Sequence, residues 1–453
     1  MALFAFVVTI GLVYLALPWF NSVADKKIEL LWSSPLFWLI GIGFSVLTGI
    51  LAGSYPALYL SSFQPVQVLK GTFRAGRGAS LPRQVLVVLQ FSVSVILIIG
   101  TVVVFRQIQF AKNRPIGYER NGLINVYLQT NDIHKHFDAV RNELKTQNAI
   151  VEMTEAGAPT TQVWNSNGGF TWSGKDPSLA VDFPNNGVNH EFGKTVGWKF
   201  KEGRDFSRDF ASDSLTFVIN EAMARFLGFE KPVGETLTWN DTNYKIIGII
   251  EDMVIESPYE PVRPSLWHID RYNNVNLVIL KLNPDMNAAE SLEKIKTVFT
   301  RYSPSSPFSY EFVDAEYARK FEGEERIGKL ASAFAGLAIF ISCLGIFGLA
   351  SFVAEQRTKE IGVRKVMGAS VTNLWAMLSK DFVVLVSISL LVAMPLSWYF
   401  MSAWLQKYQY RSDMAWWIFA AAGVGALLIT LLTVSYQSIK AAMANPVKSL
   451  RSE

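Results

Sequence analysis

The chain has 453 residues, of which 50% are hydrophobic, 13% are aromatic and 18% are charged. A soluble globular domain carries about 25% charged residues, so this composition indicates a membrane protein and excludes a disordered or collagen-like chain. The single cysteine, Cys343, excludes a disulfide framework and a multi-cysteine zinc site. The formal net charge of +4 is explained by where the basic residues lie.

Apolar runs without charged residues occur six times, and each is long enough to cross a bilayer as a helix, which takes about 20 residues. In chain order the predicted spans are Ala2–Ala24, Phe37–Leu60, Val85–Phe105, Leu330–Ala354, Phe382–Gln406 and Met414–Ile439. A single run of this kind could be a buried helix of a soluble core, but six of them predict a polytopic membrane protein. The first run lacks a preceding basic segment and contains Leu17-Pro18-Trp19-Phe20, which favours a spanning helix over a signal peptide.

The basic residues of the short loops and the tail indicate the orientation. The loops after the second and fourth spans and the C-terminal tail hold twelve Lys and Arg residues, whereas the two short loops on the opposite side hold four. This asymmetry predicts a cytoplasmic tail and places the long segment 107–329 outside. That segment, counted with Arg106, holds 26 basic and 31 acidic residues, so the basic character of the chain belongs to the cytoplasmic loops and nucleic-acid binding is not supported.

The long outer segment reads as an α+β domain. Asn240-Asp241 between two β-rich runs predicts a hairpin turn. The predicted strands are Leu123–Leu128, Leu215–Ile219, Tyr244–Ile250, Asn276–Leu282 and Ser309–Val313, and the predicted helices are Asp132–Gln147, Glu221–Gly228 and Asn287–Arg301.

Three patterns in the outer segment suggest sites, and each has a simpler interpretation. Gly187 is followed by Gly193-Lys194-Thr195 with five intervening residues, where a phosphate-binding loop needs four. His134 and His136 stand at i,i+2, so a helix points the two rings apart. Asp205, Asp209 and Asp213 lack the spacing of a calcium loop and read as loop and cap acids. With no nucleophile–base motif in the chain, we expect no catalytic apparatus, no metal and no cofactor.

Self-comparison finds a repeat at an offset of 381 residues. The matched pairs are Leu47/Leu428, Leu51/Leu432, Ser54/Ser435, Tyr55/Tyr436, Pro65/Pro446, Val66/Val447, Leu69/Leu450 and Lys70/Arg451. The repeat predicts that residues 1–70 are the last two spans of an incomplete first unit, with roughly 300 residues missing upstream. Residues from about 80 onward then form one whole unit.

The stretch Glu355–Ser370, EQRTKEIGVRKVMGAS, closely resembles the cytoplasmic coupling segment of the FtsX/MacB-type ABC transporter permeases. The resemblance covers nearly the whole chain in order. It extends to Leu81–Val103, Gly117-Tyr118-Glu119, Glu202–Phe210, Val218–Gly228, Lys231–Leu237, Ile246–Pro264 and Phe334–Phe352. The two-unit arrangement resembles the long duplicated permeases of this family. The sequence departs from the family pattern in lacking the front of the first unit.

The resemblance implies a polytopic α-helical membrane protein with six spans and an inserted α+β extracytoplasmic domain. The implied domains are 1–70, the end of an incomplete FtsX-like unit; 80–106, a span and stalk; 107–329, a MacB-like periplasmic core domain; and 330–453, an FtsX-like permease domain with the coupling segment 355–380. Stalk extensions are expected at Arg106–Arg114 and Glu316–Lys329. The implied location is the bacterial inner membrane.

The coupling segment itself is compatible with a helix over Gln356–Met367 that Gly368 ends as a C′ glycine. Glu360 and Arg364 stand at i,i+4 and can pair, and Gly362 permits close approach of another backbone. The residues expected to contact an ATPase are Arg357, Lys359, Glu360, Gly362, Arg364, Lys365 and Gly368. A basic helix that only fixes topology and binds anionic lipid is the alternative from physics alone. Cys343 and Gly345 are expected to be helix-packing residues.

The family also implies partners and a function. The expected partner is a separate cytoplasmic ATPase that binds ATP, so the chain itself needs no cofactor. Two permease units are expected to act as a dimer or pseudo-dimer, and an envelope protein is a possible further partner. The leading hypothesis is a permease of the mechanotransmission type that moves its outer domain to export or extract an envelope substrate. The alternative is an envelope signalling or scaffold protein that activates a cell-wall hydrolase.

Overall fold

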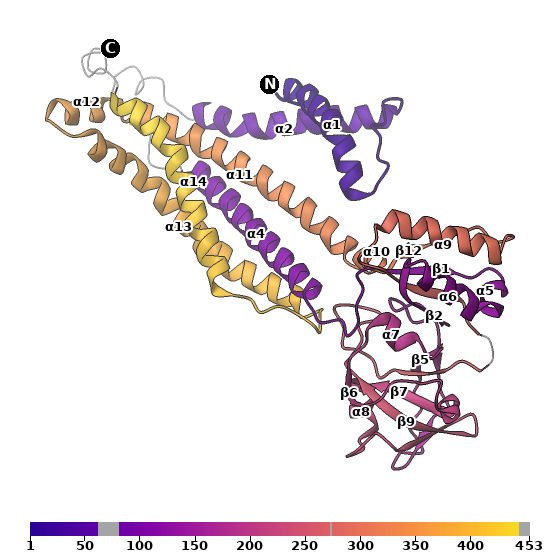
Figure 1. Cartoon of the computed structure of the whole chain (residues 1–453). Helices are drawn as coiled ribbons and strands as arrows, with labels where there is room; N and C mark the ends of the chain where they lie inside the picture. The colour runs from indigo at the N-terminus through magenta and orange to yellow at the C-terminus, as the bar shows by residue number, and fades with distance from the viewer. Residues whose placement is uncertain (62–80, 272–273, 444–453) are drawn as a thin grey trace. The chain divides into compact units, whose positions relative to one another are not determined.

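The computed structural model describes residues 1–61, 81–271 and 274–443. The chain divides into two units. The first comprises residues 1–106, 324–404 and the chain from 413 onward. The second comprises residues 107–323 and the short segment 405–412. The membrane helices lie in the first unit and the sheet lies in the second (Figure 1).

Six helices of the described residues are long and apolar enough to cross a membrane. They are α1 (Ala2–Ala24), α2 (Pro35–Ser61), α4 (Leu81–Lys112), α11 (Glu322–Gln356), α13 (Val371–Leu405) and α14 (Trp416–Met443). Each contains one predicted span or overlaps nearly all of it, which confirms the six-span prediction. Helices α4, α11 and α13 extend past their apolar runs, because helix formation does not require apolar residues and no proline or glycine ends the helix at the apolar boundary.

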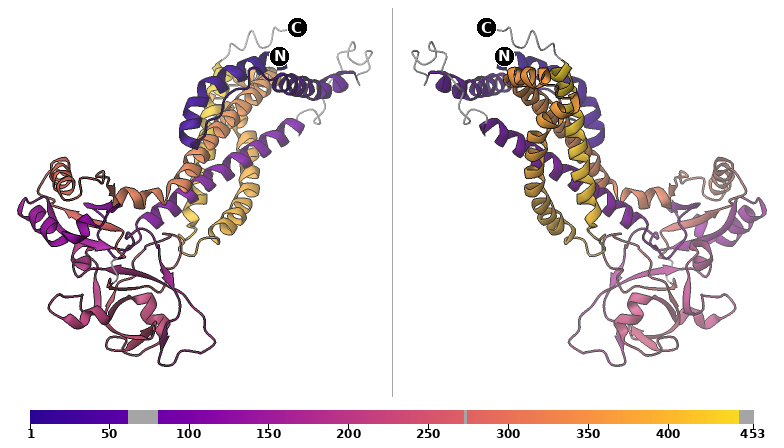
Figure 2. Two further views of the ribbon diagram at one scale, coloured as in Figure 1. Left: turned by 90° about the vertical axis from the view of Figure 1, so that its right-hand side faces the viewer. Right: turned by 90° about the vertical axis from the view of Figure 1, so that its left-hand side faces the viewer.

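Small polar side chains connect four of these helices, α4, α11, α13 and α14, which lie side by side in both views of Figure 2. The Ser94 and Ser342 hydroxyls lie 2.9 Å apart and join α4 to α11, and Trp375 Nε1 donates to Ser435 Oγ of α14 at 2.8 Å. Gly345 packs against α4, since a Cβ at this position would lie 3.1 Å from Gln90 Oε1. Small residues allow such close packing between spanning helices, so the packing role predicted for Gly345 is confirmed.

The 381-residue repeat extends to the helix boundaries. Shifted by 381, the first residue of α2, Pro35, falls on Trp416, where α14 begins, and the last residue of α1, Ala24, falls on Leu405, where α13 ends. The paired helices therefore have matching outer ends. The matched pairs from Pro65/Pro446 to Lys70/Arg451 lie outside the described residues.

The second unit is built on one mixed sheet in which twelve strands take part. The strands are β1 (Leu123–Tyr127), β2 (Ile150–Ala156), β3 (Ser166–Asn167), β4 (Thr171–Trp172), β5 (Phe183–Val188), β6 (Phe200–Gly203), β7 (Thr216–Asn220), β8 (Thr236–Trp239), β9 (Thr242–Ile250), β10 (Leu266–Ile269), β11 (Leu277–Leu282) and β12 (Glu311–Phe312). Their order is β12-β1-β11-β2-β5-β10-β7-β9-β8-β4, with β3 paired to β5 and β6 paired to β9. The pairs β5/β10 and β7/β9 are parallel, and the other pairs are antiparallel.

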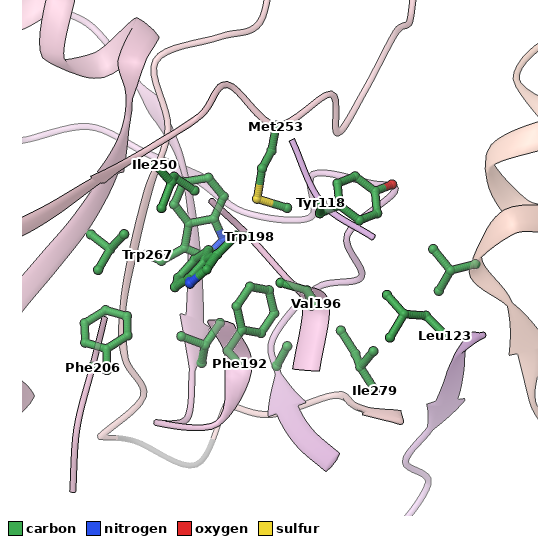
Figure 3. Close-up of a cluster of buried hydrophobic side chains, with 14 of the residues drawn as sticks. Tyr118, Leu123, Phe192, Val196, Trp198, Phe206, Ile250, Met253, Trp267 and Ile279 are labelled. Atoms are coloured by element: carbon green, nitrogen blue, oxygen red, sulfur yellow. The ribbon is translucent and has the colours of Figure 1, made fainter. Parts of the chain in front are cut away.

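Buried side chains hold the sheet to its helices. Helices α6 (Phe137–Thr146) and α9 (Ala288–Tyr302) bury Val140, Leu144 and Ile295 against β1, β2 and β11. A second cluster surrounds Trp267, which is 1% exposed, and includes Phe192 of α7 (Phe192–Val196) together with Trp198 (Figure 3). The two indole rings meet edge to face with centroids 5.7 Å apart. Large aromatic side chains give these clusters most of their buried apolar area.

The structure confirms several predicted elements of the outer segment and corrects others. Asn240 and Asp241 both have positive φ and form the turn between β8 and β9, as predicted. The predicted helix Asp132–Gln147 is wrong in its continuity, because it breaks at His136 into α5 (Asp132–Lys135) and α6. The remaining short helices are α8 (Glu221–Leu227), α10 (Val313–Arg319) and the 3-10 helix Ala211–Leu215.

One further strand boundary differs from its prediction, and the predicted stalk contains a break. The predicted strand Ser309–Val313 shortens to β12, because Val313 begins α10. The predicted stalk Glu316–Lys329 contains an interruption between two helices, since α10 ends at Arg319 and α11 begins at Glu322. The interruption is stabilised by Lys320, whose ammonium donates to the carbonyls of Thr161, Ile255 and Glu256. These three acceptors come from loops far away in sequence, so local patterns did not reveal the break.

Asn220 at the start of α8 is buried and holds two loops together. Its Oδ1 accepts from the Met223 and Ser265 amides at 2.9 and 3.0 Å, and its Nδ2 donates to Arg263 O at 2.8 Å. We expect Asn220→Ala to destabilise the second unit by about 2–4 kcal/mol. The substitution removes a helix cap and leaves the Ser265 amide and the Arg263 carbonyl without their hydrogen-bond partner. Unfolding of the purified chain, followed by tryptophan fluorescence, measures this. Asn287→Ala removes the exposed cap of α9 and is the matched control, expected to cost about 1 kcal/mol or less.

Candidate coupling site

The segment that follows α11 forms a separate short helix, α12 (Thr358–Val366). The predicted helix Gln356–Met367 is therefore corrected, because the chain breaks at Arg357 between α11 and α12. Gly368 follows with φ +88°, its amide donates to Lys365 O, and the Ala369 amide donates to Arg364 O. This is the Schellman pattern, so the prediction that Gly368 ends the helix is confirmed. Residues 371–380 of the predicted coupling segment belong to α13.

The exposed side of α12 combines an ion pair with apolar side chains. Arg364 Nη2 lies 2.8 Å from Glu360 Oε1, which confirms the predicted i,i+4 pair. Val363, Val366 and Met367 are 48%, 67% and 81% exposed, and their i, i+3, i+4 spacing places them on one side of the helix. We call these three residues the α12 apolar patch. Large apolar side chains exposed together mark a surface that binds another molecule.

The opposite side of α12 packs within the chain. Ile361 is buried with Leu374 and Leu378 of α13. Gly362 is also buried and lines a cavity of about 250 Å³ with Lys365 and with Gln437 and Lys440 of α14. Gly362 and α14 are therefore on two walls of one cavity, and the burial of Ile361 holds α12 against α13.

The predicted contact residues divide between these two sides. Glu360 and Arg364 are exposed, and Arg357 is half-buried with Nη2 2.8 Å from Asp381 Oδ2 of α13. The side chain of Lys359 lies outside the described part of the structure. Their role toward an ATPase stays a prediction. The predicted contact residues are charged residues and glycines and leave out the α12 apolar patch, although an i, i+3, i+4 count over Val363, Val366 and Met367 could have found it.

The segment 405–412 between α13 and α14 belongs to the second unit. Its anchor is Gln107, a fully buried residue near the end of α4. Gln107 Nε2 donates to Tyr410 O at 2.9 Å, and the Ser412 amide donates to Gln107 Oε1 at 2.7 Å. The Tyr410 amide donates to Tyr259 O at 2.8 Å. We call Gln107 and residues 405–412 the loop clamp.

Aromatic and cationic contacts reinforce the loop clamp. The Tyr410 ring stacks on Phe110 with centroids 4.7 Å apart, and the Arg114 guanidinium lies 4.3 Å from the Tyr410 centroid. Arg114 Nη1 also donates to the carbonyls of Pro258 and Glu260, at 3.0 and 2.6 Å. A cation held over an aromatic ring contributes up to about 2 kcal/mol when it is desolvated. The loop is therefore bound to the end of α4 and to the outer domain at several points.

The glycine and histidine patterns of the outer segment have structural roles. Gly193 packs where a Cβ would collide with Trp198 and Asp205, and the Thr195 hydroxyl donates to Glu191 O. His134 Nδ1 lies 3.0 Å from Glu155 Oε2, whereas His136 Nδ1 lies 2.9 Å from Asp132 O. His134 is therefore held by the buried Glu155, while Gly193 and Thr195 serve local packing and hydrogen bonding. Within the described ranges no three His, Cys, Asp or Glu side chains gather as a metal would require.

The three aspartates serve their own loop, as predicted. Asp213 pairs with Arg204 at 2.6 Å, Asp209 lies 3.1 Å from the Ser207 hydroxyl, and Asp205 accepts from Trp198 Nε1 at 3.1 Å. Burial raises the pKa of Asp205 to about 6 from its ordinary 3.8. The folded state thus binds a proton that the unfolded state releases between pH 4 and 6.

The raised pKa predicts a pH dependence of stability. The stabilisation from protonated Asp205 is complete below pH 3.8 and is lost as the pH rises through about 6. We expect wild type to gain a few degrees in melting temperature between pH 7 and pH 5 relative to Asp205→Asn, which cannot titrate. Thermal unfolding of both proteins at a series of pH values checks this. Parallel curves for the two proteins contradict it.

Comparison with known proteins gives two domain matches. Residues 85–298 match the MacB-like periplasmic core domain, and residues 332–446 match the FtsX-like permease C-terminal domain. The first match covers most of the second unit, and the second match contains α12.

Individual relatives are distant. The chain is 23% identical over 200 residues to the macrolide export ATP-binding/permease protein MacB of Aggregatibacter actinomycetemcomitans. This alignment covers 42% of this chain and 31% of that protein. It is 23% identical over 287 residues to the uncharacterized ABC transporter permease YknZ of Bacillus subtilis, which covers 59% of this chain and 70% of YknZ. The crystal structure of the periplasmic region of MacB from Actinobacillus actinomycetemcomitans aligns with 44% of this chain and 92% of that structure, at 15% identity and a TM-score of 0.32.

Proposed function

We propose that this chain, which belongs to the FtsX/MacB-type permeases of ABC transporters, couples ATP hydrolysis by a separate cytoplasmic ATPase to movement of its outer domain. The observation that carries the proposal is the outer side of α12, where the α12 apolar patch adjoins the Glu360–Arg364 pair. The segment that bears it lies inside the match to the FtsX-like permease domain.

The chemistry of this surface suits a protein partner. An apolar centre flanked by a paired acid and base is a composition found in protein interfaces, and the Glu360–Arg364 pair neutralises one of the basic charges that a lipid-binding helix would present to the headgroups. The α12 apolar patch supplies the area and the Glu360–Arg364 pair supplies orientation. We infer that ATP is bound by the partner, and that α12 and the tail lie on the cytoplasmic side of the bacterial inner membrane.

Covalent connections between the two units support the mechanical part of the proposal. The boundary between the units falls within α4, at Arg106/Gln107, and within α11, at Gly323/Glu324. The loop clamp adds a further connection, since residues 405–412 belong to the second unit while α13 and α14 belong to the first. Helix α4 continues past this boundary to Lys112, and a helix is stiff along its axis because every turn is hydrogen-bonded, so a displacement of α4 is passed to the outer domain. Such movement serves export or extraction of an envelope substrate.

The proposal is tested by co-purifying the chain with the ATPase encoded nearest to it and measuring ATP turnover in lipid. We expect a stable complex with turnover, and we expect Glu360→Lys or Arg364→Glu to leave insertion intact but to separate turnover from transport. The exchanged double variant Glu360→Arg/Arg364→Glu keeps the ion pair and so controls for an effect on helix stability. An exposed pair of this kind contributes only about 0.5 kcal/mol to the stability of its helix. Unchanged coupling in both single variants contradicts the assigned surface.

A further inference from the structure

The second unit contains a cavity of about 400 Å³ that neither the coupling site nor the loop clamp uses. It lies over one face of the sheet. Asn185 and Gly187 of β5 are two residues apart and so share a face, and Gly187 is the register partner of His268 on β10. Trp239 of β8 and Tyr244 of β9 continue the lining across the sheet. Because Gly187 has no side chain, the space above it stays open, and a Cβ there would lie 3.2 Å from Asp270 Cβ.

One wall of the cavity is aromatic and rigid. The Trp239 and His268 ring centroids are 5.4 Å apart, and Trp239 and Tyr244 are 6.1 Å apart. Each of the two larger rings is supported from behind, Trp239 by Phe170 at 5.3 Å and Tyr244 by Phe217 at 4.4 Å, both in stacked geometry. These rings are therefore held in place before any ligand enters, which lowers the entropic cost of binding.

Polar atoms with unused hydrogen-bonding capacity line the same cavity. Asn185 is only 8% exposed, its Nδ2 donates to Phe183 O at 3.1 Å, and within the described residues no group donates to its Oδ1. The Tyr244 hydroxyl also has no partner there, although Tyr244 is only 6% exposed. His268 Nδ1 lies 3.2 Å from Ile269 O, and burial lowers the pKa of His268, so the ring is neutral near pH 7 with Nε2 as an acceptor. The Asn185 amide oxygen is therefore left to accept from water or from a ligand in the cavity.

The lining points to the ligand class. Asparagine side chains also come from Asn165, Asn167, Asn274 and Asn276, and an amide donates and accepts at once, as pairs of neighbouring hydroxyls do. Asp270 and Arg271 are the charged residues of the described lining and have opposite signs, so the cavity has no net preference for an ion. Ile269 is its aliphatic side chain. This chemistry suits a neutral, polyhydroxylated ligand with an apolar C–H face for the aromatic wall.

We propose that this cavity binds a neutral saccharide of one or two pyranose rings. Its volume falls within the range of small-molecule sites, about 300–1,000 Å³. A peptide is the other ligand that amide side chains could bind, but an extended peptide recognises a free strand edge, whereas this cavity lies over the face of paired strands. The proposal goes beyond the coupling function, because binding to the outer domain requires neither the ATPase nor turnover.

The test is saturation-transfer NMR on the full-length chain in a detergent without a sugar headgroup, since a glucoside or maltoside would compete. The probes are N,N′-diacetylchitobiose, maltose and cellobiose, with trialanine as the peptide alternative. We expect at least one disaccharide to bind, and we expect Tyr244→Phe and Asn185→Leu each to weaken that binding about tenfold or more, because each removes hydrogen-bonding atoms and retains the shape. Tyr310→Phe, at an exposed position outside the cavity, is the matched control and should bind as wild type does.

Three results overturn the proposal. They are the absence of binding by all three disaccharides to folded wild-type protein, binding that both cavity variants retain in full, and binding of trialanine in place of a sugar. Thermal unfolding of each variant verifies that it is folded, and the two variants act on different strands, so a folding defect in one leaves the other informative. None of these results depends on co-purification with an ATPase, so failure here and failure of the coupling function are distinguishable.

Discussion

Replacing Val366 and Met367 together by Asp is expected to weaken association with the ATPase by about 30- to 1,000-fold, while membrane insertion and folding stay as in wild type. Burying one large apolar side chain contributes about 1.5–3 kcal/mol, and allowing for partial burial the two side chains contribute about 2–4 kcal/mol together. Both are largely exposed in this chain, at 67% and 81%, so their loss removes little from the fold itself.

Co-purification over a range of ATPase concentrations, followed by turnover in lipid, measures the effect of the double substitution. Leu179→Asp is the control, because it places a negative charge of the same kind at an exposed apolar position of the outer domain, 39% exposed. We expect the control to bind as wild type does. If the double variant binds the ATPase with wild-type affinity, the α12 apolar patch is not the interface and the exposed apolar residues of α12 have another role.

Gln107→Leu is expected to release the loop clamp. Leucine nearly preserves the size of the buried side chain but removes the acceptor for the Ser412 amide and the donor to Tyr410 O. Each buried group left unpaired costs about 1–3 kcal/mol, so local opening of residues 405–412 should become at least tenfold more frequent. Because this loop connects α13 and α14 to the second unit, transport per ATP hydrolysed should fall while ATP turnover continues.

Hydrogen–deuterium exchange at Tyr410 and Ser412 measures the opening, since both amides donate hydrogen bonds inside the clamp. Tyr410→Leu, which removes the ring stacked on Phe110 and covered by Arg114, should raise exchange in the same residues. Exchange at α9, whose buried residues pack with α6 and with β1, β2 and β11, serves as the internal control and should not change. Protection of residues 405–412 that survives both substitutions contradicts the clamp.

The coupling site illustrates how far local patterns reach. The C-terminal end of α12 at Gly368 and the Glu360–Arg364 pair depend on residues within one or two helical turns, and both were predicted correctly. The break at Arg357 was not predicted, because the charged sequence on both sides is equally compatible with helix. Which apolar residues of α12 are buried depends on α13 and α14, and so the exposure of Val366 and Met367 became visible only in the structure.

The outer domain shows the same division. Strands with strong β-branched or alternating patterns, such as β1, β9 and β11, were predicted, whereas β2 was not, because Glu152, Thr154 and Glu155 interrupt its apolar residues. The structure explains these polar residues, since Arg141 and Lys145 pair with Glu152 and His134 contacts Glu155. The partners lie on α5 and α6. The residues of the strand alone therefore do not predict that these polar side chains are paired.

The sequence by itself determined the membrane class, the six spans, the turn at Asn240-Asp241 and the end of α12, because each follows from the hydrophobicity or backbone preferences of neighbouring residues. Tertiary structure alone decided the strand order, the attachment of residues 405–412 to the outer unit through Gln107, and the meeting of Asn185, Trp239 and His268 around one cavity. The three cavity residues stand on β5, β8 and β10, and only the pairing of strands distant in sequence brings them to one face of the sheet.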